Sequence, residues 1–169
     1  MKKSLFLLML LLCCLPLSAH QFSTAYLDLQ LQQNTVQGSW KVTIHDLAQA
    51  GVIKGDRQQQ ISWQQLLDSS AEVVAYIQQR LLFTDSSTDC PLQTSAKADW
   101  MLQNLQQEFY LIVHFSVECH QYKQPKLHYQ ALFDAVPTHK LLLQWQSVDG
   151  QRRAVLTQQQ QGFSFNFVH

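Results

Sequence analysis

Histidine is the residue type in this sequence that is best placed to do chemistry. The chain has seven histidines, and His20 directly follows Ala19, where a signal peptidase would cut. Cleavage there would make His20 the first residue, with a free α-amine beside its imidazole. Together these two nitrogens can chelate copper, nickel or zinc. The alternative is that His20 merely follows the cleavage site and binds nothing.

A complete metal site would need a second histidine from elsewhere in the chain. The candidates are His45, His114, His120, His128 and His139. We single out the pair His20 and His139 as candidate ligands for copper or nickel. Plainer roles compete with this: His139 stands beside Pro137 and Thr138, where it would close a turn, and His45 would form an exposed hydrogen-bonded pair with Asp46.

The first nineteen residues have the layout of a cleaved secretory signal. Lys2 and Lys3 precede an apolar run from Leu5 to Leu15, and residues 16–19 supply a turn and a small residue. The run is shorter than the ~20 apolar residues that a membrane-spanning helix needs. We therefore predict a signal peptide at 1–19 and a single domain at 20–169. The processed protein is expected in the periplasm or outside the cell, and it is not expected to span a membrane.

Cys90 and Cys119 are the two cysteines that remain after such processing. In an oxidising compartment an isolated pair of this kind usually forms a disulfide. A metal-binding or redox pair is the alternative, but the spacing is not Cys-x-x-Cys. We therefore predict the disulfide Cys90–Cys119.

Charge and motifs argue against two classes of function. Removing Lys2 and Lys3 leaves ten basic residues against twelve acidic ones, so there is no basic footprint for nucleic acid. The sequence has no Gly-x-Ser-x-Gly elbow, no His-Glu-x-x-His helix and no glycine-rich phosphate loop. Its carboxylates are scattered. We therefore expect a protein that is not an enzyme and does not bind nucleic acid.

Hydrophobic periodicity indicates which elements would position these residues. Alternation predicts half-buried strands at 25–31, 36–44 and 109–117, the last with Phe109 and the following odd-numbered residues facing inward. Shorter strands are expected at 127–133, 140–146, 154–157 and 163–168, with Asp149-Gly150 as a hairpin turn. Residues 61–83 have helical spacing instead. We predict a helix at about 62–83 that begins with a capping box formed by Ser62 and Gln65.

These elements predict a fold that is mainly β with one helical insertion, in the α+β class. The arrangement expected is an antiparallel β-sandwich, immunoglobulin-like in a broad sense.

Several short motifs, in their order along the chain, are similar to those of a known family. They are Ala19-His20 with Ala25-Tyr26-Leu27, Gly38-Ser39-Trp40 with Asp46-Leu47, Ile61-Ser62-Trp63, Cys90-Pro91-Leu92 with Cys119, and Tyr129 and Leu132-Phe133-Asp134 with His139-Lys140. In this order they resemble the exported N-terminal domain of HupE/UreJ-like membrane proteins. The resemblance implies an extracytoplasmic domain with a cysteine pair.

The sequence departs from that family in two respects. Family members continue into several transmembrane helices, to which nickel or cobalt transport is attributed, and this sequence does not, so transport is not expected. Relatives also carry a loop that looks like an EF-hand. Here Lys54, Gln59 and Gln65 stand where calcium needs a carboxylate, a glycine and a bidentate acid, so we expect a degenerate loop without calcium.

Two functions remain open at this point. The first is a non-catalytic accessory or interaction module, secreted or periplasmic, which docks on an integral membrane protein of the metal-transport-like kind and needs no cofactor. The second is a periplasmic copper- or nickel-binding protein that uses His20.

Overall fold

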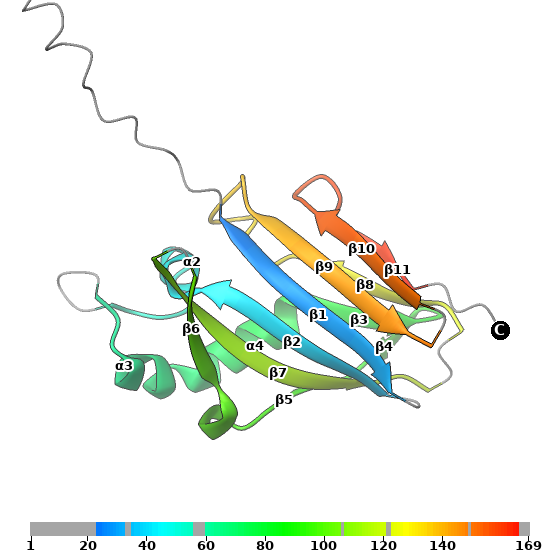
Figure 1. Cartoon of the computed structure of the whole chain (residues 1–169), viewed down its shortest axis with the longest axis horizontal. Coiled ribbons are helices and arrows are strands. Elements are labelled where there is room, and N and C mark those ends of the chain that lie inside the picture. Colours follow the sequence, from blue (N-terminus) through cyan, green and yellow to red (C-terminus); the bar gives the residue numbers. More distant parts are fainter. Residues whose placement is uncertain are drawn as a thin grey trace, which may run out of the picture.

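The structure of the chain is a computed structural model that describes residues 23–32, 35–55, 60–105, 107–120, 123–148 and 150–165. The predicted signal peptide and His20 lie outside the described residues. Two β-sheets pack against each other with helices at one end, as Figure 1 shows. This confirms the predicted fold class, a mainly β sandwich of the α+β kind.

The larger sheet has seven strands, and its order is β10-β9-β1-β2-β7-β5, with β6 also pairing with β7. The strands are β1 (Thr24–Gln32), β2 (Thr35–Thr43), β5 (Leu92–Thr94), β6 (Met101–Leu105), β7 (Glu108–Glu118), β9 (Lys140–Ser147) and β10 (Gly150–Leu156). All neighbours are antiparallel except β1 and β9, which run parallel. The expected purely antiparallel pairing is therefore wrong at this pair. The long chain between the two strands permits the parallel connection, which a tight hairpin cannot make.

The smaller sheet has four strands in the order β11-β8-β3-β4. They are β3 (Leu81–Asp85), β4 (Thr88–Cys90), β8 (Pro125–Tyr129) and β11 (Gly162–Ser164). The core lies between the two sheets, where Trp40, Trp145 and Tyr129 are almost fully buried. Gly38 is needed in this core, because a Cβ there would lie 2.2 Å from the Phe115 ring.

Strand alternation is confirmed in most of the predicted strands. Ala25, Leu27 and Leu29 of β1 face the core, and so do the odd-numbered residues of β7 from Leu111 to Val117. Phe109 is the exception, since it is 54% exposed. It lies on the inward-facing side of β7 but beyond the end of the packed core, close to the turn that joins β6 to β7. The prediction that Phe109 faces inward into the core is therefore wrong.

The helices differ from the single predicted insertion. The described helices are α2 (Ile44–Gln49), α3 (Trp63–Asp68), α4 (Ser70–Arg80) and the short 3-10 helix η1 (Lys97–Asp99). The capping box of Ser62 and Gln65 is confirmed at the start of α3. The predicted helix ends early, at Arg80, because Leu81 and Phe83 are buried on either side of the exposed Leu82, which is the alternation of a strand.

Three predicted strands end earlier than expected. The strand from 36 ends at Thr43, whose side chain accepts a hydrogen bond from the Asp46 N–H and so starts α2. The strand from 127 ends at Tyr129, and Leu132 has a φ of +69°, which is incompatible with an extended chain. The predicted strand at 163–168 is seen as β11, which ends at Ser164, and residues 166–168 lie outside the described residues.

Candidate functional site

The short helix α2 separates two very different environments at one end of the larger sheet. Asp46 and Leu47 face the protein interior, and both are buried. His45, Ala48 and Gln49 face an open groove on the other side. The Thr43 cap fixes the first turn of α2, because its Oγ1 lies 3.0 Å from the Asp46 nitrogen. The position of α2 therefore decides which polar groups are enclosed and which remain accessible.

On the enclosed side, four polar side chains form a continuous hydrogen-bonded chain. The Ser23 hydroxyl donates to Asp46 Oδ2 at 2.8 Å. Ser23 Oγ lies 2.5 Å from His139 Nδ1, and the Tyr129 hydroxyl lies 3.0 Å from His139 Nε2. Residues from the start of β1, from α2, from the end of β8 and from the turn before β9 therefore meet at one point. We call Ser23, Asp46, Tyr129 and His139 the buried polar chain.

The direction of each hydrogen bond in the buried polar chain follows from counting protons. Ser23 has one hydroxyl proton and gives it to Asp46, so His139 Nδ1 must carry a proton and donate it to Ser23 Oγ. His139 Nε2 then has a free lone pair and accepts from the Tyr129 hydroxyl. His139 is 1% exposed, and burial lowers its pKa to about 4. Burial also raises the pKa of Tyr129 well above its ordinary value, so both groups are neutral at pH 7.

This arrangement does not have the geometry of a serine hydrolase triad. In a triad the histidine lies between the carboxylate and the serine, and it takes the serine proton. Here Ser23 lies between Asp46 and His139, and its proton goes to the carboxylate. The buried polar chain therefore ties β1, α2 and the turn before β9 together, and we assign it a structural role.

The structure separates the histidines that sequence analysis named as candidate ligands. His139 has both ring nitrogens within hydrogen-bonding distance of Ser23 or Tyr129, and its backbone N–H closes the predicted turn by donating to the Val136 carbonyl. The other described candidates are all exposed: His45, His114, His120 and His128. In the described part of the chain, no group of three or more His, Cys, Asp or Glu residues is arranged to hold a metal ion.

The predicted exposed pair of His45 and Asp46 is wrong, because the two side chains diverge. His45 is exposed, whereas Asp46 is buried and accepts from Ser23. The helical geometry of α2 explains this, since successive residues on a helix point about 100° apart.

The segment for which the sequence predicts a degenerate calcium loop continues into a helix cap. Gln65, which stands where calcium would need its bidentate acid, accepts a hydrogen bond from the Ser62 N–H at 2.8 Å. Lys54 is exposed. The other named position of this loop, Gln59, lies outside the described residues. The side chain at the last ligand position is therefore committed to starting α3.

The predicted disulfide between Cys90 and Cys119 is confirmed, with a sulfur–sulfur distance of 2.05 Å. It connects the end of β4 to the residue that follows β7, and so it joins the two sheets. A disulfide of this kind is typical of proteins in an oxidising compartment outside the cytoplasm. Among the described helices, none is both long and apolar enough to cross a membrane.

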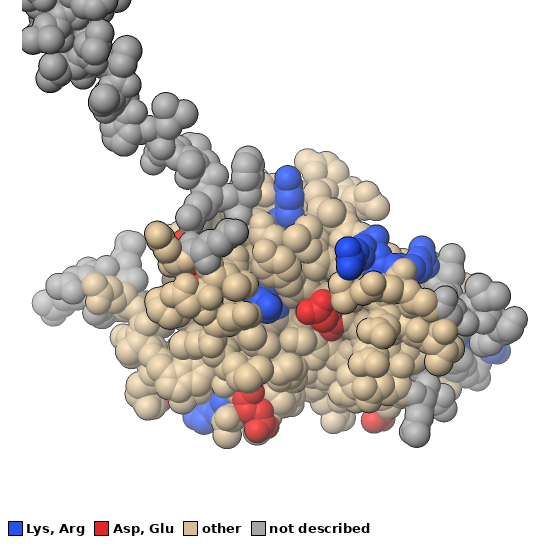
Figure 2. All heavy atoms as spheres, in the orientation of Figure 1, with Lys and Arg blue, Asp and Glu red and all other residues tan. Residues whose placement is uncertain are grey.

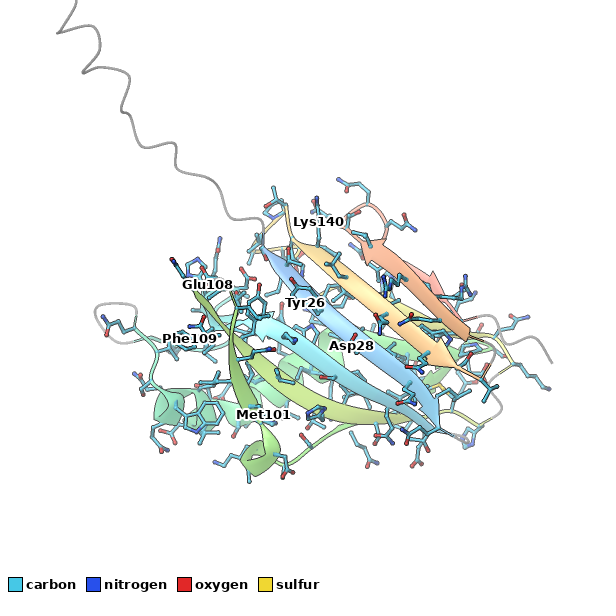
Figure 3. All side chains as sticks on the ribbon, in the orientation of Figure 1. Tyr26, Asp28, Met101, Glu108, Phe109 and Lys140 are labelled. Atoms are coloured by element: carbon cyan, nitrogen blue, oxygen red, sulfur yellow. A yellow bond between two sulfur atoms is a disulfide. The ribbon has the colours of Figure 1, made fainter. Side chains whose placement is uncertain are left out.

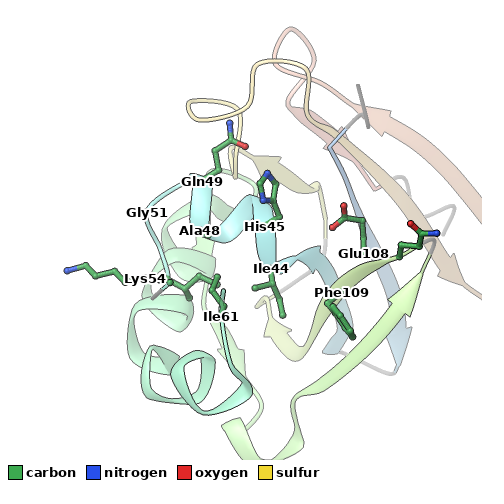
Figure 4. Close-up of a pocket in the computed structure, with 12 residues that line it drawn as sticks. Ile44, His45, Ala48, Gln49, Gly51, Lys54, Ile61, Glu108 and Phe109 are labelled. Atoms are coloured by element: carbon green, nitrogen blue, oxygen red, sulfur yellow. The ribbon is translucent and has the colours of Figure 1, made fainter. Parts of the chain in front are cut away.

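On the other side of α2 lies an open groove of about 990 Å³. Its floor is apolar and is formed by Ile44, Ile53, Ile61 and Phe109, while polar side chains stand around the rim: His45, Gln49, Lys54, Gln107 and Glu108. Figure 4 shows Ile61 on one side of Ile44 and Phe109 on the other. We call this the α2 groove. It offers an apolar surface that no part of the described chain covers.

Sequence analysis missed the α2 groove because it placed Phe109 in the core. One signal could have revealed the error. Phe109 is the second residue of β7 and lies beside the turn that joins β6 to β7, and a position at the end of a strand has fewer neighbours to cover it than one in the middle. Comparison of the chain with protein-family models and with curated proteins finds no match in either.

Proposed function

We propose that the chain is a non-catalytic interaction module that acts in the periplasm or after secretion. Its partner would be an integral membrane protein of the metal-transport-like kind, as the resemblance to HupE/UreJ-like proteins implies. The disulfide supports an oxidising compartment. The observation that carries the proposal is the α2 groove. There the aromatic side chain of Phe109 is exposed to solvent although the core of the domain is well packed.

The chemistry of the α2 groove defines the segment that would bind there. Phe109 lines the groove and is 54% exposed, and aromatic side chains are enriched among binding hot spots. The rim carries the cation Lys54 and the anion Glu108 on different elements. We therefore propose that the occupant is an extracytoplasmic loop of the membrane partner with one large apolar side chain between residues of opposite charge.

The buried polar chain supports a non-catalytic role for the same end of the molecule. Its histidine is neutral and makes two hydrogen bonds, and its serine gives its proton to a carboxylate. These groups hold the domain together, and the accessible surface beside them is mostly apolar. Binding is the activity that such a surface supports best.

Site-specific photocrosslinking in the cells that produce the protein tests this proposal. A photoreactive phenylalanine analogue would replace Phe109 in one variant and Val148, which is 94% exposed in the β9–β10 turn, in the control. We expect a membrane-fraction product from position 109 and none from position 148, and mass spectrometry should identify a protein with several transmembrane helices. Absence of such a product, or equal products from both positions, would reject the proposal.

The alternative function, copper or nickel binding through His20, needs a separate test because His20 lies outside the described residues. His139 would have to give up its bond to Ser23 or to Tyr129 in order to bind a metal. Copper(II) titration of protein that begins at His20 should be compared with the His20→Ala variant and with a form extended by one residue. Equal affinity in all three would remove His20 from consideration.

A further inference from the structure

The strand β6 is an edge of the larger sheet. Its five residues pair with the first half of β7, and β7 in turn pairs with β2 on its other side. The edge strands β4, β5 and β11 have only three residues each, so β6 and β10 are the longer edges among the described strands. A longer edge leaves a row of backbone N–H and C=O groups that can pair with another strand.

The side chains of β6 are unusual for an exposed edge, because none of them is charged. Its sequence is Met-Leu-Gln-Asn-Leu, and Met101 and Leu102 are 48% and 40% exposed on its two faces. The β10 edge is different, since it carries Arg152 and Arg153. Natural proteins commonly place charges on edge strands to prevent pairing with other chains. The β10 edge has this protection and the β6 edge does not.

The geometry points to β6 as the strand through which two copies of this chain pair, antiparallel, about a two-fold axis at Gln103. In that register Gln103 lies opposite Gln103 of the second copy, and two amides can both donate and accept. Met101 then lies opposite Leu105, and Leu102 opposite Asn104. Each pair is apolar or neutral, so the strand is complementary to itself, as a two-fold interface requires.

The charge of the molecule favours a second copy as the occupant of this edge. Without the predicted signal peptide the chain has ten basic and twelve acidic residues, a formal net charge of −2, so two copies repel each other only weakly at long range. Figure 2 shows few charged side chains on the visible face, with Lys and Arg side chains gathered toward the β10 side of the molecule. Figure 3 shows Met101 beside the open face of the larger sheet, which also carries Tyr26 and Asp28.

The size of the contact sets its expected strength. Pairing through five residues a side buries less than the roughly 1,200–2,000 Å² of a standard stable interface. The dimer is therefore expected to be weak, with a dissociation constant on the order of 10⁻⁵ M. This pairing does not depend on docking at the α2 groove, so either proposal can fail without the other.

Sedimentation velocity of the processed protein between about 1 and 500 µM tests the pairing. We expect the dimer fraction to rise with concentration in the wild type. Gln103→Lys should be monomeric throughout, because it places two like charges opposite each other on the axis. An equimolar mixture of Gln103→Lys and Gln103→Glu should dimerise again. Gln151→Lys makes the same change on the β10 edge and should dimerise like the wild type.

A wild type that stays monomeric at 500 µM, or a Gln103→Lys variant that dimerises normally, would overturn the proposal. Gln103→Cys gives a second measurement if the lysine variant does not fold. Directly opposed residues have Cα atoms about 4.5–5.5 Å apart, which a disulfide can bridge. Asn104→Cys is the control, because it would lie opposite Leu102 and beyond disulfide reach of itself. Crosslinking at 104 but not at 103 would rule out the proposed register.

Discussion

The two faces of α2 differ in whether their side chains have partners inside the protein. On the inner face, Asp46 begins the buried polar chain. The Ser23 hydroxyl and both ring nitrogens of His139 have hydrogen-bond partners in it. On the outer face, His45 and Phe109 line a groove that the described residues leave open. Both faces belong to one helix of six residues. The proposed recognition surface therefore lies on the opposite face of α2 from the side chains that hold this end of the molecule together.

The hydrogen bonds on the inner face of α2 explain why we assign its titratable residues a structural role. A buried polar network must be fully satisfied, since a lost partner leaves a costly unpaired group. Residues such as His139 are therefore fixed by their structural role. The α2 groove offers a different kind of surface, because several of its lining side chains are apolar and open to solvent.

Replacing the two histidines on opposite sides of α2 would give the largest contrast. His139→Ala should lower the free energy of unfolding by about 3 kcal/mol, because it opens a cavity and leaves Ser23 and Tyr129 without their partner. His45→Ala should change it by less than about 0.5 kcal/mol, since the side chain is exposed. Urea unfolding of the two variants measures both values. Equal losses would show that α2 does not divide the two environments.

Acid should act on the enclosed side of α2 through His139. Its pKa in the folded protein is about 4, below the ordinary value of about 6.5. As the pH falls from 6.5 to 4, the unfolded chain binds a proton at this residue before the folded chain does. Stability should therefore be lost across this range, by about 3 kcal/mol in total, and should be independent of this group above pH 7.

The measurement for this prediction is the unfolding free energy at several pH values for the wild type and for His139→Gln, which does not titrate. Subtracting the two profiles removes the contribution of the carboxylates. A difference that stays constant from pH 7 to pH 4 would mean that the folded His139 binds a proton as readily as an exposed one.

Thr43 caps α2, whose two faces border the buried polar chain and the α2 groove. Removing this cap should lower stability by less than His139→Ala and by more than His45→Ala. Thr43→Ala should cost about 1 kcal/mol of stability, because the Asp46 N–H loses its acceptor. Thr43→Ser keeps the hydroxyl and is the matched control. If α2 also shapes the groove, photocrosslinking from position 109 should weaken in Thr43→Ala and persist in Thr43→Ser. Normal crosslinking in both would show that the groove does not depend on the cap.

Local patterns allowed much of the sandwich to be predicted from the sequence. Alternation located β1, β2, β7 and β9, and the capping box located the start of α3, because these features depend on neighbouring residues. The disulfide could be predicted because only two cysteines remained to be paired. The helix α2 was missed because six residues are too few to establish a helical period. Residues 81–83 were misassigned because their spacing fits both a helix and a strand.

The candidate site was harder to predict because it depends on contacts between distant residues. Ser23 and His139 are separated by 116 positions, and nothing in the local sequence of either residue indicates the other. The prediction that His139 closes a turn is confirmed, since its backbone N–H donates to the Val136 carbonyl, but the position of its side chain in the buried polar chain was not predicted. The parallel pairing of β1 with β9 was missed for the same reason, since it is a long-range choice among several strands.

The residue that we expect to matter most for binding should contribute little to stability. Phe109→Ser should lower the free energy of unfolding by less than about 1 kcal/mol, because half of this side chain is already in water. Phe115→Ser changes the same residue type on the same side of β7, but Phe115 is 3% exposed and should cost about 3–5 kcal/mol. Co-purification of the membrane partner identified by photocrosslinking should be lost in Phe109→Ser although the protein remains folded. If this variant instead unfolds as readily as Phe115→Ser, Phe109 belongs to the core, and the outer face of α2 is not a recognition surface.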